Sequence, residues 1–275
     1  YCSVVDLVDQ AMKRHAHRPA MRCAGQTLSY ADLDRLSRDF AAYLQGPLGV
    51  KKGDRIAVMM PNLLAFPIAF LGIARAGAVQ VNVNPLYTPR ELEHQLNDAG
   101  VQTIVVYGGV SAKVAEVMSR TGLKTVVTVG VGDGSGKVLP RPPVDARLKG
   151  ATAFTDALAQ GAPLSFTPVD LKGDDLVFLQ YTGGTTGLSK GAALSHRNLI
   201  ANTEQFKAFM PEALRPGEEV IVTAIPLYHI FALMVNFLAY FSVGGENWLV
   251  ANPRDLGGLI DVLKAARPTV FTGVN

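Results

Sequence analysis

Residues 180–191 read QYTGGTTGLSKG and bring together the groups that bind phosphate in proteins. Glycine lacks the Cβ atom that keeps an anion away from backbone N–H groups, hydroxyl side chains donate hydrogen bonds, and lysine supplies a positive charge. A flexible glycine-rich turn with a solvated lysine is the alternative, and it is the commoner case for an isolated cluster. The density of donors here favours an anion site. Its candidate residues are Tyr181, Thr182, Gly183, Gly184, Thr185, Thr186, Gly187, Ser189, Lys190 and Gly191.

Two common phosphate-binding motifs do not fit this stretch. A Walker A loop follows the pattern G-x-x-x-x-G-K-[ST] and leads directly into a helix whose N-terminus faces the phosphates. Here the fifth residue after Gly183 is Leu188, and the GAALS that follows Lys190 is typical of a strand. The dinucleotide pattern G-x-G-x-x-G after a first strand is also absent. The sequence therefore predicts a phosphate-binding loop between two strands.

A lone histidine marks a second segment of interest, PLYHIFAL at residues 226–233. His229 stands at the start of an apolar run, where a buried or helix-capping histidine is the commoner case. The run LYHIFALMVNFLAYFSV has 17 residues, which is the lower edge of the length that spans a membrane. Because it also contains the polar residues Asn236 and Ser242, we expect a helix of the protein core.

These segments belong to a regular alternation of strand and helix patterns. Short apolar runs predict strands at 55–60, 79–83, 103–107, 125–129, 176–181, 192–195, 220–224, 246–250 and 269–272. Amphipathic periodicity predicts helices at 3–15, 29–44, 63–77, 89–99, 111–120, 196–209, 228–243 and 256–266. Strands that alternate with helices favour βαβ units. The predicted fold class is α/β, with two βαβ-type halves whose mainly parallel sheets are flanked by helices.

The predicted organisation has four parts. Residues 1–53 form an N-terminal helical segment, 54–134 a first α/β subdomain, and 174–275 a second α/β subdomain that carries the glycine-rich loop. Residues 135–173 are predicted to be a linker or surface excursion, because GVGDGSGK and PRPP interrupt helices and central strands there. No helix follows the last predicted strand, so we expect the second subdomain to be incomplete and the chain to be part of a longer protein.

The composition argues against several classes of protein. Apolar residues make up 48% of the 275 residues, which is enough for a sizeable core, and disorder is not expected. The net charge is only +3 and charged residues are 18%, so the sequence gives no electrostatic case for nucleic-acid binding. Cys2 and Cys23 are the only cysteines, which argues against a disulfide framework and fits a reducing cytoplasm.

The longer string YTGGTTGLSKGAALSHRN resembles the phosphate-loop signature of the adenylate-forming enzymes, a superfamily of acyl-CoA synthetases, luciferases and peptide-synthetase adenylation domains. The order of Thr, Gly and Lys matches, and not only the composition. Further segments agree in the same order along the chain, namely GDRIAVMMPN at 53–62, the stretch 74–100, and VTAIPLYHIFAL at 222–233. NPLYTPRELEHQL and PLYHIFAL look most similar to bacterial long-chain fatty-acid CoA ligases.

The resemblance implies an acid-thiol ligase with a two-step reaction. A fatty-acid carboxylate would attack the α-phosphate of ATP and release pyrophosphate, and the acyl group would then pass to the thiol of coenzyme A. Mg²⁺ would accompany ATP. Because anions meet and separate in this reaction, positioning and charge neutralisation should dominate the barrier. On this reading Thr182 and Thr185 are hydroxyl donors to the β- and γ-phosphates, and Lys190 is their counter-charge.

The same resemblance gives the PLYHIFAL segment a substrate role. His229, the one residue predicted to be catalytic, would contact the carboxylate region of the acid or help to gate its pocket. The acyl tunnel would be lined by Tyr228, His229, Ile230, Leu233, Met234 and Phe237. Ordinary core packing explains the spacing of the apolar residues equally well, so both interpretations stay open. Some related enzymes place a tryptophan gate near Leu233, which this sequence lacks.

The resemblance also indicates what these residues do not supply. In the family, the acidic Mg²⁺ ligand, the ribose-binding aspartate and the adenylation lysine belong to later segments, so no metal ligand is assigned and we expect this chain alone to lack catalytic competence. Two alternatives remain open: an adenylating enzyme that loads a carrier protein, and a non-catalytic nucleotide-binding module. A cytoplasmic location, peripheral contact with the inner face of the membrane and a homodimer are further expectations.

Overall fold

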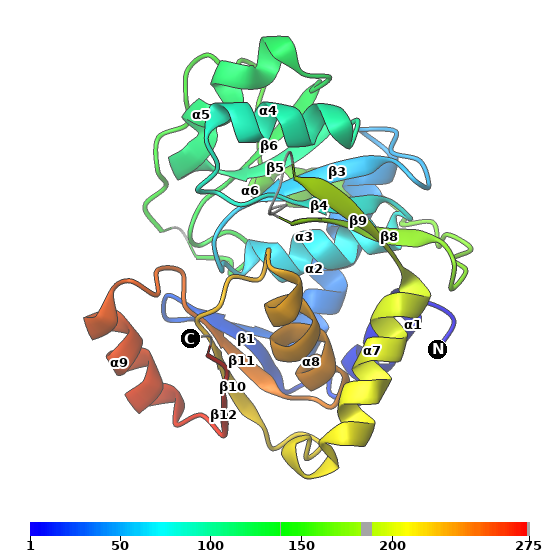
Figure 1. The fold of residues 1–275 in the computed structure, drawn as a ribbon, viewed down its shortest axis with the longest axis vertical. Helices are drawn as coiled ribbons and strands as arrows, with labels where there is room; N and C mark the ends of the chain where they lie inside the picture. The colour runs from blue at the N-terminus through cyan, green and yellow to red at the C-terminus, as the bar shows by residue number, and fades with distance from the viewer. Residues whose placement is uncertain (138, 183–188, 274–275) are drawn as a thin grey trace.

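Two β-sheets form the framework of the chain, in a computed structural model that describes residues 1–137, 139–182 and 189–273 (Figure 1). Within these residues the larger sheet has seven strands in the order β7-β6-β5-β3-β4-β8-β9. Its neighbouring strands are parallel except β8 and β9, which form an antiparallel hairpin at one edge. The strands are β3 (Arg55–Met59), β4 (Val79–Asn82), β5 (Thr103–Tyr107), β6 (Thr125–Val129), β7 (Thr152–Ala153), β8 (Leu176–Thr182) and β9 (Lys190–Ser195).

The smaller sheet joins the N-terminal residues to the C-terminal third of the chain. In the described part of the chain it has five strands in the order β12-β10-β11-β1-β2, and only β1 and β2 are antiparallel. The strands are β1 (Pro19–Cys23), β2 (Gln26–Ser29), β10 (Val220–Thr223), β11 (Glu246–Leu249) and β12 (Val270–Phe271). The pairing of β1 with β11 brings residues from opposite ends of the chain side by side.

Helices cover the larger sheet and fill the space between the two sheets. In Figure 1, α4 and α5 lie on one face of the larger sheet, whereas α2 and α3 lie between that sheet and the smaller one. The α-helices are α1 (Val4–Arg14), α2 (Tyr30–Gln45), α3 (Ala65–Arg75), α4 (Pro89–Asp98), α5 (Ser111–Val117), α6 (Phe154–Gly161), α7 (His196–Phe209), α8 (Tyr240–Ser242) and α9 (Leu256–Ala266). A π-helix spans Ala232–Ala239, and short 3₁₀ turns span Gly108–Val110, Met118–Arg120 and Pro211–Ala213.

Side chains alternate in direction along each strand, and in β3 of the larger sheet the apolar side chains of both sets are covered by other elements. In β3, Ile56 and Val58 pack into the core that contains α2 and α3, whereas Ala57 and Met59 pack into the core that contains α4 and α5. Successive side chains of a strand point to opposite faces, and all four of these are buried. Burial on both faces accounts for the continuous apolar sequence of this parallel strand.

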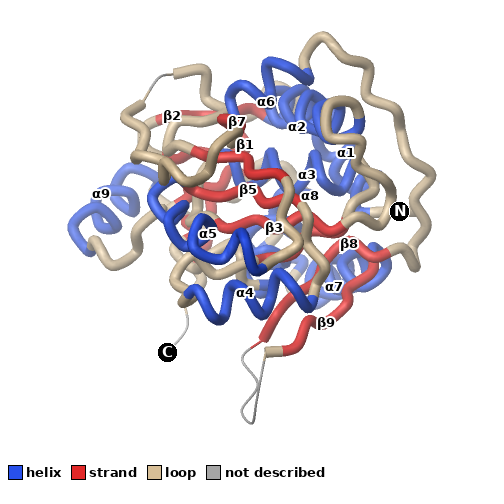
Figure 2. Tube along the Cα trace, turned by 90° about the horizontal axis from the view of Figure 1, so that it is seen from above, coloured by secondary structure: helices blue, strands red, loops and turns tan. Residues whose placement is uncertain are grey.

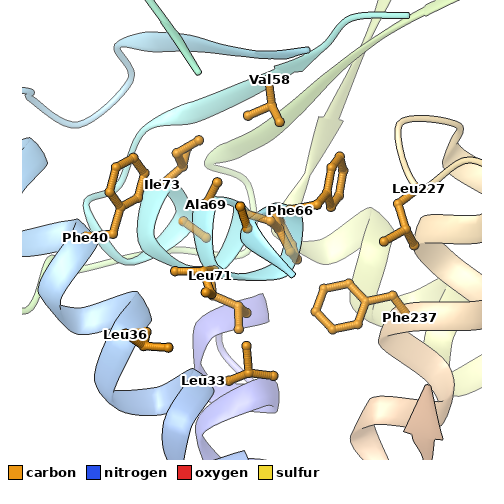
Figure 3. Packing of buried hydrophobic residues seen from close by; sticks show 14 of the residues in the cluster. Leu33, Leu36, Phe40, Val58, Phe66, Ala69, Leu71, Ile73, Leu227 and Phe237 are labelled. Carbon is orange, nitrogen blue, oxygen red and sulfur yellow. The ribbon is translucent and has the colours of Figure 1, made fainter. Parts of the chain in front are cut away.

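Helix α3 lies at the centre of the protein, and each of its residues is buried. Figure 3 shows its side chains between Phe40 of α2 on one side and Phe237, from the C-terminal third, on the other. The rings of Phe70 and Phe237 meet edge to face, with centroids 5.7 Å apart. Gly72 lets α2 approach closely, because a Cβ atom at this position would lie 2.8 Å from the Phe40 ring. Helix α3 therefore connects the apolar cores of the two sheets.

The predicted α/β fold class with mainly parallel sheets is confirmed, and most elements begin and end within a few residues of their predicted bounds. The two sheets do not correspond to the subdomains predicted from the sequence. The hairpin of β8 and β9 extends the sheet built from residues 54–134, whereas β1 and β2, from residues 1–53, complete the sheet of the C-terminal third. Local patterns specify that a strand forms, but a strand's partner depends on packing between distant segments.

The segment 135–173, expected to be a linker or surface excursion, contains β7 and α6. Phe154 of α6 is fully buried, and its ring lies 4.9 Å from that of Phe40 in α2. Helix α6 has eight residues and no side-chain cap, so its local sequence signal is weak. Packing against α2 is what stabilises it.

A buried arginine ties three helices together. Arg75, the last residue of α3, has a side chain that is 1% exposed and donates to Asp9 of α1 at 2.6 Å and to Asp34 of α2 at 2.7 Å. Its Nε donates to Ser37 Oγ at 3.0 Å. Burial lowers the pKa of Arg75 and raises the pKa of Asp9, while the attraction between the two groups opposes both shifts. The partly exposed carboxylates keep some hydration while they neutralise the buried guanidinium.

Replacing Arg75 with methionine should destabilise the fold, because both carboxylates would then face an apolar side chain. Breaking a buried ion pair from one side costs roughly 3 to 5 kcal/mol, and the partial exposure of Asp9 and Asp34 favours the lower end. Urea denaturation of Arg75→Met should therefore give a free energy of unfolding lower by about 3 kcal/mol. Arg35→Met is the control, since Arg35 is 61% exposed and its two carboxylate contacts are 3.6 and 3.5 Å long. It should lose less than about 1 kcal/mol, and equal losses in the two variants would contradict the role given to Arg75.

His196 connects the first helix to the helix that follows the glycine-rich hairpin. Its Nδ1 accepts a hydrogen bond from the Val4 backbone N–H at 3.1 Å, and its side chain is buried. Burial lowers the pKa of His196 to about 4, the nearby Asp175 opposes that shift, and Lys52 adds to it. An accepting nitrogen carries no proton, so the neutral ring is the form that makes this contact.

Folding stability should fall as pH drops from about 6.5 to 4, because the unfolded state then binds a proton on His196 that the folded state does not. One group of this kind contributes at most about 1.4 kcal/mol per pH unit within that window. His196→Gln keeps a hydrogen-bond acceptor but cannot titrate, so its free energy of unfolding should depend less on pH. Urea unfolding at several pH values measures this. An unchanged pH dependence in His196→Gln would refute the assignment.

Candidate functional site

The hairpin of β8 and β9 carries the predicted phosphate loop and lies at the edge of the larger sheet (Figure 2). The structure describes the base of this loop on both strands. Gly183, Gly184, Thr185, Thr186 and Gly187 lie outside the described residues. The described candidates are Tyr181, Thr182, Ser189, Lys190 and Gly191.

Thr182 and Lys190 stand opposite each other on the two strands. Cross-strand partners project from the same face of a sheet, so the Thr182 hydroxyl and the Lys190 ammonium belong to one side of the hairpin. Both residues are exposed. A hydroxyl donor and a positive charge beside a glycine-rich loop are groups that can bind an anion together.

Tyr181 belongs to the opposite face of the hairpin, and its contacts are with the protein. Its ring lies across Gly191, where a Cβ atom would be only 2.8 Å from a ring carbon. Its hydroxyl donates to Asp98 Oδ2 in α4 at 2.5 Å. Burial raises the pKa of Tyr181 and the hydrogen bond to Asp98 raises it further, so the phenol stays protonated at neutral pH. The absence of a side chain at Gly191 makes room for this ring.

A buried asparagine holds the backbone that leads into the PLYHIFAL segment. Asn62, which follows β3, donates through Nδ2 to the carbonyl oxygens of Thr223 and Ile225, both at 3.0 Å. Its Oδ1 accepts from the Leu227 N–H at 2.7 Å. One side-chain amide thus satisfies three backbone groups where β10 has ended. The segment before Tyr228 is thereby fixed to the end of the larger sheet.

A chain of buried amides connects the hairpin to the same segment. Gln180 of β8 donates to the Tyr228 carbonyl oxygen at 3.3 Å, and its Oε1 accepts from Asn82 Nδ2 at 3.1 Å. Asn82 Oδ1 accepts in turn from Gln80 Nε2 at 2.7 Å. These contacts join the ends of β4 and β8 to the backbone beside His229. The sequence alone does not single out Asn62 or Gln180, because a buried amide has no sequence signature apart from its partners.

An apolar groove of about 760 Å³ opens between α7 and the π-helix. Ile230 and Met234 line it, whereas Leu233 and Phe237 are fully buried in the core. The structure thus separates the predicted tunnel residues into two that face the groove and two that pack inward. The other lining residues are Leu194, Asn198, Leu199, Asn202, Gln205, Phe206, Phe209, Phe231 and Val235.

Tyr228 and His229 are not among the residues that line this groove. Tyr228 lines a separate cavity of about 350 Å³, together with residues that include Asn62, Pro85 and Arg254. His229 is exposed, and its Nδ1 accepts a hydrogen bond from the Phe231 N–H at 3.3 Å. This contact agrees with a helix-capping histidine, and a substrate role for His229 stays a prediction.

The helix that borders the groove is wider than the α-helix predicted for it, because Ala232–Ala239 form a π-helix. Its buried Asn236 donates to Thr223 Oγ1 at 3.1 Å and to Thr272 Oγ1 at 2.8 Å. The Asn236 carbonyl accepts from Asn247 Nδ2 at 2.8 Å. These bonds hold the π-helix against the smaller sheet. Such helices are rare and often occur at functional sites.

Among the described residues, no three His, Cys, Asp or Glu side chains are grouped so that they could hold a metal ion. No helix in this part of the chain combines the length and apolar character needed to cross a bilayer.

The sequence is similar to known ligases along its whole length. A family profile described as AMP-binding enzyme matches residues 8–275. A long-chain-fatty-acid--CoA ligase of Escherichia coli O6:H1 is 46% identical over 286 aligned residues, which cover 100% of this chain and 51% of the relative. The chain therefore spans about half the length of the curated relatives it matches.

The fold is also found in solved structures. The crystal structure of the anthranilate CoA ligase AuaEII in complex with anthranoyl-AMP superposes with a TM-score of 0.85 at 20% identity, covering 98% of this chain and 49% of that one. A long-chain-fatty-acid-CoA ligase (FadD1) from Archaeoglobus fulgidus gives a TM-score of 0.81 at 23% identity, covering 98% and 51%. The profile match, which extends over nearly all of these residues, shows that the chain belongs to the family of AMP-binding enzymes.

Proposed function

We propose that this chain is the part of a long-chain fatty-acid CoA ligase that binds the ATP phosphates and the acyl chain. The observation that carries the proposal is the 46% identity to such a ligase across the whole chain. The geometry supports it, because a hairpin with anion-binding groups contacts Tyr228 through Gln180, and an apolar groove is lined by Ile230 and Met234 a few residues further on. A phosphate site and an apolar site are thus joined by one short segment.

In the proposed first step, the fatty-acid carboxylate attacks the α-phosphate of ATP and pyrophosphate leaves. The Thr182 hydroxyl and the Lys190 ammonium would bind the β- and γ-phosphates together with the loop residues, among them Thr185. Donors fixed in place stabilise the charge that builds up on the leaving pyrophosphate without having to reorient during the reaction. The carboxylate is already ionised at neutral pH, so this step needs no general base.

The acyl chain would occupy the groove between α7 and the π-helix. Its volume of about 760 Å³ is within the usual range of ligand pockets, and most of its lining is apolar. His229 follows Tyr228 directly, and the Tyr228 carbonyl oxygen accepts the hydrogen bond from Gln180 of the hairpin, which supports a role for His229 near the carboxylate. In this proposal Tyr228 and His229 border the reacting end of the acid, and Leu233 and Phe237 support the groove from the core.

The remaining partners are proposed from the family. Coenzyme A would accept the acyl group in the second step. Mg²⁺ would enter with ATP and reduce the charge on its phosphates, and none of the described residues is assigned to it. Peripheral contact with the inner face of the membrane is supported by the apolar rim of the groove, where Phe209 is 85% exposed and Phe231 is 40% exposed. A cytoplasmic location stays a prediction. A homodimer stays a prediction.

The proposal is tested with a protein that carries this chain at the full length of its relatives. Acid-dependent exchange between pyrophosphate and ATP measures the first step, and product analysis with coenzyme A and with a carrier protein identifies the acceptor. We expect exchange with long-chain acids, transfer to coenzyme A, and no exchange by residues 1–275 alone. Lys190→Ala should slow exchange roughly 100-fold, the usual effect of losing one charge-stabilising donor. Lys149→Ala, at another exposed lysine, should change it little. A full-length protein inactive with every acid would refute the proposal.

Filling the groove should shorten the acids that the enzyme accepts. Ile230→Trp adds volume at a partly buried lining position, so kcat/KM for the longest acids should fall roughly tenfold or more while shorter acids are retained. The KM for ATP should not change. Ile260→Trp is the matched control, because Ile260 is exposed on α9 and is not among the lining residues. An unchanged chain-length profile in Ile230→Trp would show that the acyl chain lies elsewhere.

A further inference from the structure

The base of the glycine-rich loop extends beyond the sheet that supports it. Strand β4 pairs with β8 only as far as Gln180, so Tyr181 and Thr182 pair only with Gly191 and Lys190 of β9. In the described part of the chain, β9 is the edge strand of the larger sheet. A two-stranded ribbon by itself is marginally stable in water, so the base of the loop needs contacts from outside the sheet.

Helix α4 supplies such contacts to both strands. On the β8 side, Asp98 accepts the hydrogen bond from the Tyr181 hydroxyl at 2.5 Å. On the β9 side, His94 Nε2 lies 3.1 Å from the carbonyl oxygen of Ser189, the residue before the strand begins. A carbonyl oxygen only accepts, so Nε2 of His94 carries the proton and donates. Because His94 and Asp98 are four residues apart, they share one face of the helix.

The helix that makes these contacts is itself well fixed. It begins with a capping box, and its side chains Leu92 and Leu96 are fully buried in the core on that face of the sheet. Gln95 Nε2 donates to the Asn82 carbonyl oxygen at 2.7 Å, which ties the helix to the end of β4. The two ends of the loop are therefore held by one helical turn that is anchored to the neighbouring strand.

We propose that His94 and Asp98 are positioning residues for the phosphate site, an inference that rests on the proposed ATP-dependent function. They act through Ser189 and Tyr181, which are adjacent in the chain to Lys190 and Thr182. Holding the ends of both strands reduces the entropy lost when the side chains at those ends bind a ligand. Fixing the Thr182 hydroxyl and the Lys190 ammonium also preorganises them for the charge on pyrophosphate.

Loss of either contact should weaken the use of ATP while leaving the use of fatty acid unchanged. In the protein at the full length of its relatives, His94→Ala and Tyr181→Phe should each raise the KM for ATP roughly threefold to tenfold, the range for one lost hydrogen bond. The KM for the acid should stay the same. His94→Gln, whose side-chain amide can donate to Ser189, should recover part of the loss.

Hydrogen exchange of backbone amides tests the same contacts without any enzyme activity. His94→Ala and Tyr181→Phe should speed hydrogen exchange in the described ends of β8 and β9, and leave exchange in the interior strand β5 unchanged. Two controls make matched changes elsewhere. His17→Ala removes an exposed histidine, and Tyr30→Phe removes a buried hydroxyl that donates to the Gly245 carbonyl oxygen at 2.8 Å. Neither control should alter exchange in the hairpin.

Several outcomes would overturn the inference. Unchanged hairpin exchange in both variants would show that α4 does not hold the strand ends. Faster hydrogen exchange in the hairpin with an unchanged KM for ATP would mean that the contacts are structural only. Equal changes in the KM for ATP and the KM for the acid would mean the same. If the full-length protein shows no ligase activity, the proposed function fails. The hydrogen-exchange measurement still decides whether His94 and Asp98 hold the hairpin.

Discussion

The burial of α3 between the two sheets is the constraint on which the rest of the structure depends. A helix with no exposed residue must neutralise any charge that it carries, so Arg75 requires carboxylates at its end. Asp9 and Asp34 meet that requirement and thereby bring α1 and α2 against α3. Since the same helix packs against the larger sheet and against Phe237 of the C-terminal third, it sets how the two halves meet. The candidate site is built at that meeting point.

Among the described residues, neutral amides connect the hairpin and the end of the larger sheet to the segment that leads to Tyr228. Asn62 bonds the backbone after β10, and Gln180 connects β8 to the carbonyl of Tyr228. Amides satisfy buried backbone groups without the desolvation cost of a charge, and their bonds do not change with pH near neutrality. The charged member of the described hairpin residues, Lys190, is exposed at the base of the loop. This arrangement separates groups that hold the site together from groups able to meet an anion.

The sequence predicts much of the fold, because the spacing of apolar residues and the residues that favour turns are local signals. It does not predict that β1 pairs with β11 or that the hairpin joins the larger sheet, since those partners lie far apart in the chain. It identifies the apolar residues of 228–243, but it cannot tell that Ile230 and Met234 face a groove while Leu233 and Phe237 face the core. It groups Gly191 with the phosphate ligands, but it cannot tell that the ring of Tyr181 lies across this glycine.

The order of strands in the smaller sheet has a consequence for folding. Most neighbours in the larger sheet are close in the chain, but β1 pairs with β11, and Arg22 contacts Glu246, 224 positions away. Contacts between distant residues slow folding, because the entropy of closing the loop is lost before the contact stabilises the chain. During synthesis, β1 emerges long before its partner and leaves an unpaired edge. Until the C-terminal third has been made, that edge is open to pairing with another molecule.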